Sequence, residues 1–463
     1  MSKFWRLITT GVGVAISLFQ LNSATAQTLP QIPASSASLS NSSVLELPTS
    51  PNEVKVQQVQ SLTLLQTLEL AEKNNRELQV AVLTWERSQA VLRQEQGAWY
   101  PNLALSTELV QVDNQENPTD LNFETESSSS AFLNGTLELN YDVFTFGRRS
   151  ARIKTAQKQL QFDQLELERL QQQIRLDVIN AYYDLQEADE QVRISQAAVT
   201  NAQLSLRDAR ALEEGGLGTQ LDIARATVQL KNAEQELIQA QTQQDLASDL
   251  LTRILGLPET IDVAAADPVK VGSKWNHSLE ETIIQAFQNR SEFKQQLIQR
   301  DISLQQRRIT LSEVRPNLGL FANYQAEREL SQESTDGYAV GARVRWNIFD
   351  GGITAAAAKQ EAVNAQIAET RFVDLRKQIR LEVEQAYKKL LANAKNIETA
   401  TIALQQAEKV LELVSFGYSQ GATTQLEVNT AQNELTQAAG NRVRAITNYN
   451  RSLASLQRAV NQL

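Results

Sequence analysis

The chain has 463 residues, no cysteine, one histidine and a formal charge of −10 at pH 7. Without cysteine it can form neither a disulfide framework nor a thiolate metal site or nucleophile. The acidic balance argues against a nucleic-acid partner, because phosphates require a basic face. The single histidine, His277, has no second imidazole near it in the sequence and is interpreted as a solvated loop residue.

Residues 1–26 have the pattern of a signal peptide. Lys3 and Arg6 precede an apolar run at 7–21, and the small residues Ala24-Thr25-Ala26 end the segment. An uncleaved anchor helix is the alternative, although the run is short and contains two glycines. No second long apolar run follows, so we expect no transmembrane helix. Export then leads to the periplasm, the outer membrane or the exterior.

Residues 27–60 are rich in proline and serine and show no apolar period, which predicts a disordered arm. A helical rhythm begins at Leu62 and continues to about Ala98, with an interruption near Asn74-Asn75. Pro101 then ends it.

After Pro101 the apolar period changes from near 3.6 to 2, which predicts two strands of about ten residues joined by a loop at about 113–130. A similar alternation recurs near residue 340. One side is apolar and is expected to face lipid: Leu137, Leu139, Tyr141, Val344 and Trp346. The other side is expected to face a lumen: Thr136, Glu138, Arg343 and Arg345. Such strands fit a membrane barrel, but a soluble sheet packed on one face would alternate in the same way.

A much longer helical pattern begins at Arg148. Apolar residues recur at threes and fours from Ile153 to Val192, and the rhythm restarts at Ile223 after a glycine-rich tip. The chain therefore turns and runs back beside itself as an antiparallel coiled hairpin. At 1.5 Å per residue the outward helix would be roughly 95 Å long, which suggests a device that spans distance.

The whole arrangement occurs twice. Residues 62–258 form the first repeat, 259–276 a linker and 277–463 the second repeat. The segment Gln173–Leu185 matches Gln378–Leu390 at 8 of 13 positions, with a shift of 205 residues. Before the strands the shift is 215, because the first repeat has ten extra residues in its loop between strands.

The two tips superpose under the same shift. Gly216 falls on Gly421, Thr219 on Thr424 and Asp222 on Glu427. One interpretation is structural: a glycine with positive φ turns the chain, a threonine caps the next helix, and an acid is favoured at its positive end.

Four strands per chain cannot close into a barrel, although every strand edge in lipid must be paired. Several chains must then contribute strands. Bacterial barrels begin at about eight strands, so counting alone leaves two or three chains open.

The order of elements, repeated behind a signal peptide, resembles the TolC family of outer-membrane efflux proteins. The resemblance covers about Leu62 to Leu463. The motifs that carry it are Pro-Asn-Leu at Pro101 and Pro316, the strand ends Tyr141-Asp-Val-Phe144 and Trp346-Asn-Ile-Phe349 followed by glycines, and Tyr418-Ser-Gln-Gly421. It implies a mainly α fold with a small β part: a homotrimer with a 12-stranded outer-membrane barrel continued by a periplasmic α-helical tunnel.

The resemblance also implies roles for the tips. Asp222 and Glu427 would face the pore near its periplasmic mouth. Tyr418 matches a tyrosine that holds the entrance closed, and Asp222 matches its acidic partner. Thr423 stands where the family has an arginine, so the gate is expected to be looser or to be held by other contacts. A periplasmic adaptor protein would contact the tip turns at Gly216, Gly218, Gly421, Thr219 and Thr424.

These features predict a passive exit duct for a tripartite efflux pump or a type I secretion system, placed in the outer membrane and extending into the periplasm. An inner-membrane transporter would supply the energy, since the glycine-rich tip lacks the Lys-Ser/Thr of a phosphate loop. No enzyme activity, cofactor or metal is expected, because no nucleophile and base are paired. The alternative is a structural periplasmic spacer or envelope tether.

Overall fold

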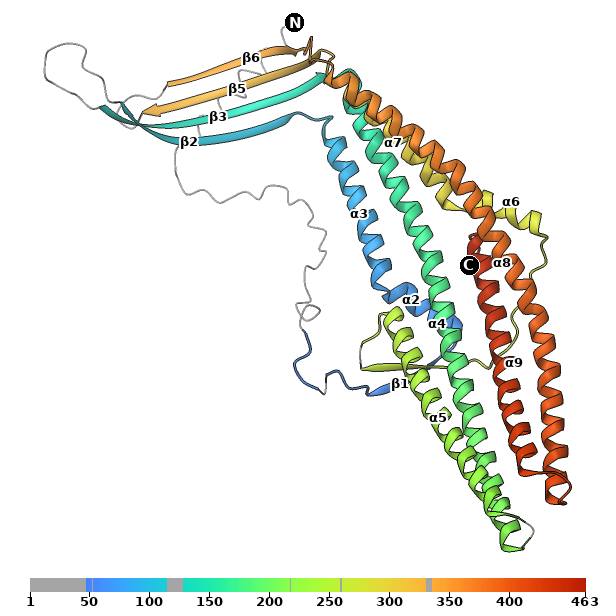
Figure 1. Ribbon diagram of the computed structural model, residues 1–463. Helices are drawn as coiled ribbons and strands as arrows, with labels where there is room; N and C mark the ends of the chain where they lie inside the picture. Colours follow the sequence, from blue (N-terminus) through green and yellow to red (C-terminus); the bar gives the residue numbers. More distant parts are fainter. Residues whose placement is uncertain (1–46, 52, 115–127, 217, 259, 330–334) are drawn as a thin grey trace. The chain divides into compact units, whose positions relative to one another are not determined.

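The computed structural model describes residues 47–51, 53–114, 128–216, 218–258, 260–329 and 335–463 (Figure 1). Val56–Leu463 form one unit, and the fold below is the fold of that unit. The predicted signal peptide and most of the predicted arm lie outside the described residues.

The described chain contains the same order of elements twice. The first half comprises β1 (Gln58–Leu62), α2 (Leu64–Asn74), α3 (Arg76–Gly97), β2 (Asn102–Asn114), β3 (Ser128–Phe144), α4 (Arg148–Glu214) and α5 (Gln220–Leu255). The second half comprises β4 (Ile261–Ala265), α6 (Leu279–Asn289), α7 (Ser291–Leu311), β5 (Asn317–Glu329), β6 (Thr335–Arg345), α8 (Ile353–Ser419) and α9 (Gln425–Ala459).

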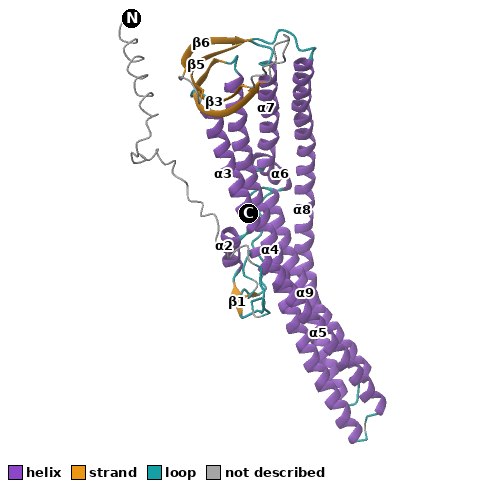
Figure 2. Ribbon diagram, turned by 90° about the vertical axis from the view of Figure 1, so that its left-hand side faces the viewer, coloured by secondary structure: helices purple, strands orange, loops and turns teal. Residues whose placement is uncertain are grey.

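The two long helices, α4 and α8, organise the rest of the unit. Each has 67 residues and is therefore about 100 Å long at 1.5 Å per residue. The first part of α4 packs against α3 and α7, and its second part packs against α5 and α9 (Figures 1 and 2). In the same way α8 packs against α7 and then α9. The predicted long hairpins are confirmed.

Four of the strands form one antiparallel sheet in the order β2-β3-β5-β6. Strands β3 and β5, from the two halves, pair at its centre, with Leu137 opposite Tyr324. Strands β2 and β6 are the two edges. The four predicted strands are thus present, and β2 and β3 extend into the region that was predicted to be a loop.

The prediction missed a second sheet, in which β1 pairs with β4 in parallel. Strand β1 begins inside the predicted arm at 27–60, so the end of that arm lies within a strand, and β4 lies inside the predicted linker at 259–276. These strands have five residues each, too few to show a clear period. The tertiary contacts stabilise them: the Tyr182 hydroxyl donates to the carboxylate of Asp267 (2.8 Å), which also accepts from the Leu64 amide (2.8 Å).

Two apolar cores hold the helices together, one in each half. In the first, α2, β1 and β4 pack on α4 and α5 around the buried side chains Tyr182, Leu185, Leu251 and Val263. In the second, α6 and α7 pack on α8 and α9 around Phe293, Ile379, Val383 and Leu456. Each core lies where a short helix pair meets the middle of a long helix.

The predicted interruption near Asn74-Asn75 is confirmed, since α2 ends at Asn74 and α3 begins at Arg76. The Asn75 side chain caps α3 by accepting from the Leu78 amide (3.0 Å) and donates to the Ile254 carbonyl (2.8 Å). In the second half, Arg290 occupies the position equivalent to Asn75.

Candidate functional site

The first tip joins α4 to α5 through a tight turn. Gly216 has φ +75°, a conformation that favours glycine. A Cβ on Gly218 would lie 2.8 Å from the Glu213 amide nitrogen, so this position also requires glycine. Thr219 then caps α5: its hydroxyl accepts from the Asp222 amide (3.2 Å), and the Asp222 carboxylate accepts from the Thr219 amide (3.2 Å).

The second tip, between α8 and α9, has the same construction. Gly421 has φ +70°. The Thr424 hydroxyl accepts from the Glu427 amide (3.3 Å), and the Glu427 carboxylate accepts from the Thr424 amide (2.6 Å). Both acids therefore complete capping boxes, in which two otherwise unpaired amide donors of the helix start are satisfied. The structural interpretation of the tip motif is confirmed, and the pore-facing role of Asp222 and Glu427 stays a prediction.

Tyr418 lies near the end of α8, half-buried and close to the first hairpin. Burial raises the pKa of its phenol, and the nearby carboxylates of Asp222 and Asp208 raise it further. Among the described residues its hydroxyl forms no hydrogen bond. The structure thus brings Tyr418 near its expected acidic partner, Asp222, but without a direct bond between them.

Thr423 is engaged within its own turn. Its hydroxyl donates to the Val414 carbonyl (2.9 Å), and its methyl group would lie 2.7 Å from a Cβ on Gly417. The side chain therefore stabilises the end of α8. A threonine side chain is too short to take the place of an arginine that reaches the first hairpin.

The sequence analysis missed the contact that joins the two hairpins near their tips. Gln425 is fully buried, and its amide donates to the Ser205 hydroxyl of α4 (2.7 Å) and to Asn429 (3.0 Å). Further along, Gln229 of α5 donates to Asn433 of α9 (2.6 Å). Glutamine recurs at both tips, as Gln220 and Gln425, but the motif alone does not identify the partner of either.

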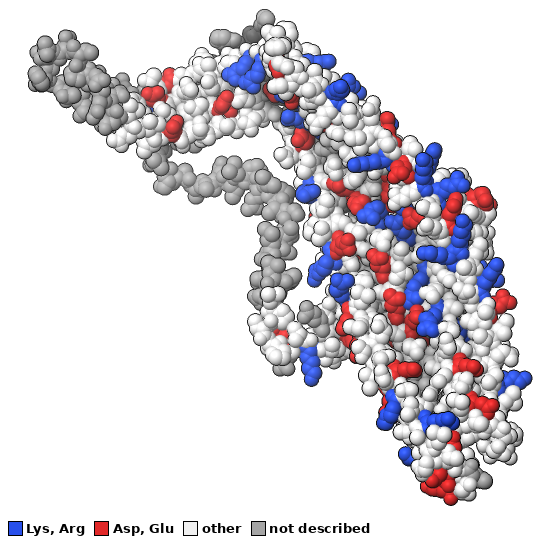
Figure 3. All heavy atoms as spheres, in the orientation of Figure 1, with Lys and Arg blue, Asp and Glu red and all other residues white. Residues whose placement is uncertain are grey.

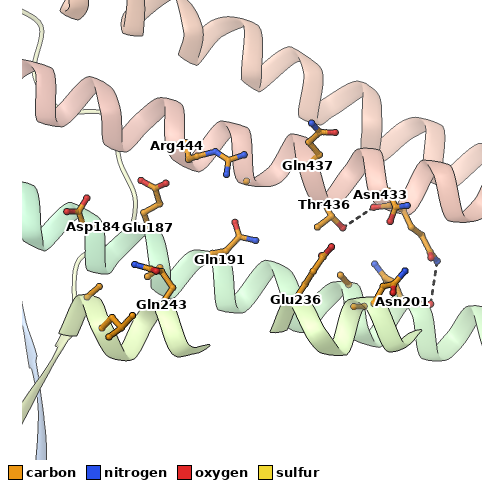
Figure 4. Close-up of a pocket in the computed structure, with 18 of the residues that line it drawn as sticks. Asp184, Glu187, Gln191, Asn201, Glu236, Gln243, Asn433, Thr436, Gln437 and Arg444 are labelled. Atoms are coloured by element: carbon orange, nitrogen blue, oxygen red, sulfur yellow. Dashed lines mark hydrogen bonds between the residues drawn. The ribbon is translucent and has the colours of Figure 1, made fainter. Parts of the chain in front are cut away.

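A polar groove of about 910 Å³ lies along α4 between α5 and α9. Figure 4 shows side chains of all three helices around it, including Glu187 and Gln191 from α4, Glu236 from α5 and Arg444 from α9. At one end, Arg451 forms ion pairs with Asp184 (2.6 Å) and Glu187 (3.0 Å). Burial raises the pKa of the Asp184 carboxyl, and Arg451 opposes that shift.

The four-stranded sheet separates apolar from polar side chains as predicted. Leu137 and Leu139 lie opposite Leu105 and Leu103, and Tyr141 lies opposite Leu320. On β6, Val344 lies opposite Leu318 on this same face. The other face has Thr136, Glu138 and Arg343, with Arg345 opposite Asn317.

Trp346 lies just outside this sheet, because β6 ends at Arg345. Its indole donates to the Val314 carbonyl (3.1 Å), so its assignment to a strand is corrected by one residue. On the face shown in Figure 3, charged side chains are frequent over the helices and sparse over the sheet. Which face meets lipid stays a prediction.

None of the helices in the described ranges is long and apolar enough to cross a membrane. Within the same ranges, no three or more His, Asp or Glu residues gather in a way that could hold a metal ion.

Comparisons with known proteins agree with this architecture. Residues 67–257 and 282–462 each match the family described as outer membrane efflux protein. The chain is 28% identical over 134 residues to the cobalt-zinc-cadmium resistance protein CzcC of Cupriavidus metallidurans. It is 25% identical over 165 residues to the outer membrane efflux protein BepC of Brucella suis. These segments are 28% and 36% of this chain, and 31% and 35% of the two relatives.

A solved structure extends the likeness to most of the chain. The CmeC outer membrane channel of Campylobacter jejuni has a TM-score of 0.73 at 15% identity, over 90% of this chain and 93% of that chain. At this identity the likeness concerns the fold. The two family matches cover both halves and confirm the predicted repeat, the resemblance and a place in the outer membrane. The chain belongs to the outer membrane efflux protein family.

Proposed function

We propose that three copies of this chain form a passive exit duct, with a 12-stranded barrel in the outer membrane and a helical tunnel in the periplasm. The observation that carries the proposal is the four-stranded sheet. It has one apolar face, and β2 and β6 are the outermost of its strands in the described part of the chain. In lipid each edge must find a partner strand.

The number of copies follows from strand count and lumen. Two copies would supply eight strands, and a barrel of that size is filled by its own side chains. Three copies supply twelve and leave room for a passage between the polar faces of the strands. The family resemblance stated above supports the same number.

The periplasmic end of the duct is the pair of tips. Three copies would bring together six carboxylates, from Asp222 and Glu427 of each chain, around the entrance. Negative charges that gather at a narrow mouth concentrate cations there. The exposed turns around Gly216 and Gly421 are where a periplasmic adaptor would dock, and an inner-membrane transporter would drive the cargo.

Planar bilayers provide the test of the duct. The purified oligomer should insert and give uniform conductance steps. A spacer or tether without transport activity should give none, so the absence of conductance from correctly folded oligomers would refute the proposal and leave the structural alternative.

A deletion strain tests the cargo class. Loss of an efflux duct should sensitise cells to small toxic compounds, whereas loss of a type I secretion duct should remove secreted proteins from the medium. The name of the Cupriavidus relative adds cobalt, zinc and cadmium to the compounds to test.

A further inference from the structure

A cavity of about 520 Å³ lies where the end of α9 meets the start of α7. Both of these helices contact α4 and α8, and the two long helices supply most of the lining. The end of α9 lies beside the middle of α8 (Figure 1). The cavity shares no lining residue with the groove of Figure 4, and the proposed duct does not require it.

Positive charge exceeds negative charge around this cavity. Its charged lining consists of four cationic side chains and two carboxylates: Arg169, Arg290, Lys389, Arg458, Glu292 and Glu382. Arg169 has an ion-pair partner outside the lining, Glu166 (2.6 Å). The two lining carboxylates are therefore left to balance the other three cations.

Arg290 engages both carboxylates most closely. Its Nε donates to Glu292 (3.0 Å), and its two terminal nitrogens donate to Glu382 (3.1 and 3.2 Å). The Arg458 guanidinium lies 3.6 Å from Glu292 and 3.3 Å from Glu382. Two guanidinium groups thus share two carboxylates, and Arg290 has the shorter contacts.

The described chain satisfies Arg458 incompletely. Its side chain is 11% exposed, and its Nε is buried with no hydrogen-bond partner among the described residues. Burial and the neighbouring Arg290 lower the pKa of the Arg458 guanidinium. A buried cation needs compensating negative charge, so a further anion beside Arg458 would complete its electrostatic balance.

Other donors around the cavity have no acceptor within the described ranges. Lys389 is exposed and forms neither an ion pair nor a hydrogen bond there. The side chains of Ser455, Gln378 and Gln385 also line the cavity, and in the same part of the chain they form no hydrogen bond. Ammonium, hydroxyl and amide groups all donate hydrogen bonds. A ligand with negative charge and several acceptor oxygens matches this set of donors.

We propose that this cavity binds a small oxyanion, a phosphate or carboxylate group held between Lys389 of α8 and Arg458 of α9. Charge-assisted hydrogen bonds from ammonium and guanidinium groups suit such ligands. The cavity volume lies within the range of small-ligand sites, about 300–1,000 Å³. The anion would join the end of α9 to the middle of α8, so its binding stabilises the second core.

Thermal unfolding of the full-length protein in mild detergent tests the site. The unfolding midpoint should rise progressively with sodium phosphate, because a ligand that binds the folded protein stabilises it by mass action. Sodium chloride at matched ionic strength controls for charge screening, and its effect should be smaller. A parallel titration with sodium acetate shows whether a carboxylate binds as well.

Two adjacent lysines provide matched variants. Lys389→Gln should raise the phosphate concentration needed for a given shift of the midpoint by about tenfold, the loss expected for one charged hydrogen bond. Lys388→Gln removes the same charge from an exposed neighbour that does not line the cavity. It should respond to phosphate as the natural protein does. Both variants leave the buried arginines and their acids in place.

The outcomes concern the site alone. A rise with phosphate or with acetate that exceeds the chloride effect and is weakened only in Lys389→Gln supports the site and identifies the class of its ligand. Equal responses of the two lysine variants, or no rise beyond the chloride effect with either anion, would overturn the proposal. Conductance enters none of these outcomes, so failure of the site leaves the proposed duct standing.

Discussion

At the scale of single residues, Asp222 and Glu427 have a structural role within a single chain. Each carboxylate accepts from the capping threonine's amide and so completes the first turn of its helix. This role needs a hydrogen-bond acceptor at the third helical position, whereas a role at the pore mouth needs negative charge. Substitutions that separate acceptor from charge distinguish the two.

We expect Asp222→Asn with Glu427→Gln to lower the preference of the pore for cations, because six charges leave the mouth while an acceptor oxygen remains at each cap. Replacing both acids by alanine should lower it equally and also loosen the tips, at a cost of about 0.5–1.5 kcal/mol for each lost hydrogen bond to a capping threonine's amide. Reversal potentials in asymmetric KCl measure the first effect and hydrogen exchange at the tips the second. An unchanged reversal potential in the amide variant would place the acids outside the pore.

We expect Gln425 to hold the two hairpins together near the predicted entrance. Gln425→Ala removes the bond to Ser205 and leaves a buried hydroxyl without its partner, which costs about 1–3 kcal/mol. The second hairpin should then separate from the first more readily, with a higher single-channel conductance. Gln420→Ala is the control, since the side-chain amide of this exposed tip residue donates to the neighbouring Ser419 hydroxyl. Equal conductance in the two variants would contradict this prediction.

At the scale of elements, the sheet register makes the predicted lipid-facing and lumen-facing sides of the strands testable. Leu139 and Val344 share the apolar face, and Thr136 lies on the other, opposite Gln325. If the apolar face meets lipid, Leu139→Arg or Val344→Arg should each cost about 2–4 kcal/mol near the bilayer midplane. Thr136→Arg should be tolerated. Membrane insertion of the three variants gives the answer, and equal insertion would show that the facing is wrong.

Arg290 occupies the break between α6 and α7 and is almost fully buried. It pairs with Glu292 (2.9 Å) and Glu382 (3.1 Å), and Arg458 approaches both acids. Burial and the neighbouring Arg290 lower the pKa of Arg458. In the second half this charged cluster lies at the junction of the two short helices. In the first half the equivalent junction has the Asn75 cap.

Arg290→Ala should therefore destabilise the protein by about 1.5–3 kcal/mol, because it removes charged hydrogen bonds to Glu382 and to the Ala459 carbonyl and leaves Arg458 as the remaining cation beside the two acids. The equivalent Asn75→Ala should cost less, about 0.5–2 kcal/mol for a lost cap. Thermal unfolding of the purified oligomer ranks the two. A lower unfolding midpoint for Asn75→Ala than for Arg290→Ala would contradict this prediction.

The parts of this fold that the sequence predicts are those with a long hydrophobic period. The stripe of α4 and the alternation of β3 each extend over many residues, so local pattern decides them before any tertiary contact forms. Positive φ at Gly216 and Gly421 follows from turn chemistry in the same way. Strands β1 and β4 are too short for such a signal and depend on contacts such as those of Tyr182.

Contacts between distant helices could not be predicted, because one sequence contains no signal for them. Gln425 and Ser205 are 220 residues apart, and nothing local to either identifies the other. The same holds for Arg290 and Glu382. Conversely, the predicted pore-facing role of the tip acids depends on neighbouring copies, which a single chain does not contain.

At the scale of the whole molecule, the sheet bears most directly on the proposed assembly. In a ring of identical copies, β2 of one copy would pair with β6 of the next through one repeated contact. The outer-membrane location of the family supplies the lipid that the apolar strand face requires.

The most direct test of this account is the native mass of the full protein extracted from membranes in mild detergent. Closure of the sheet between copies predicts a single species of three chains, because the eight strands of two chains would leave no passage. A monodisperse single chain that still conducts ions, or a stable species of two chains, would contradict the account.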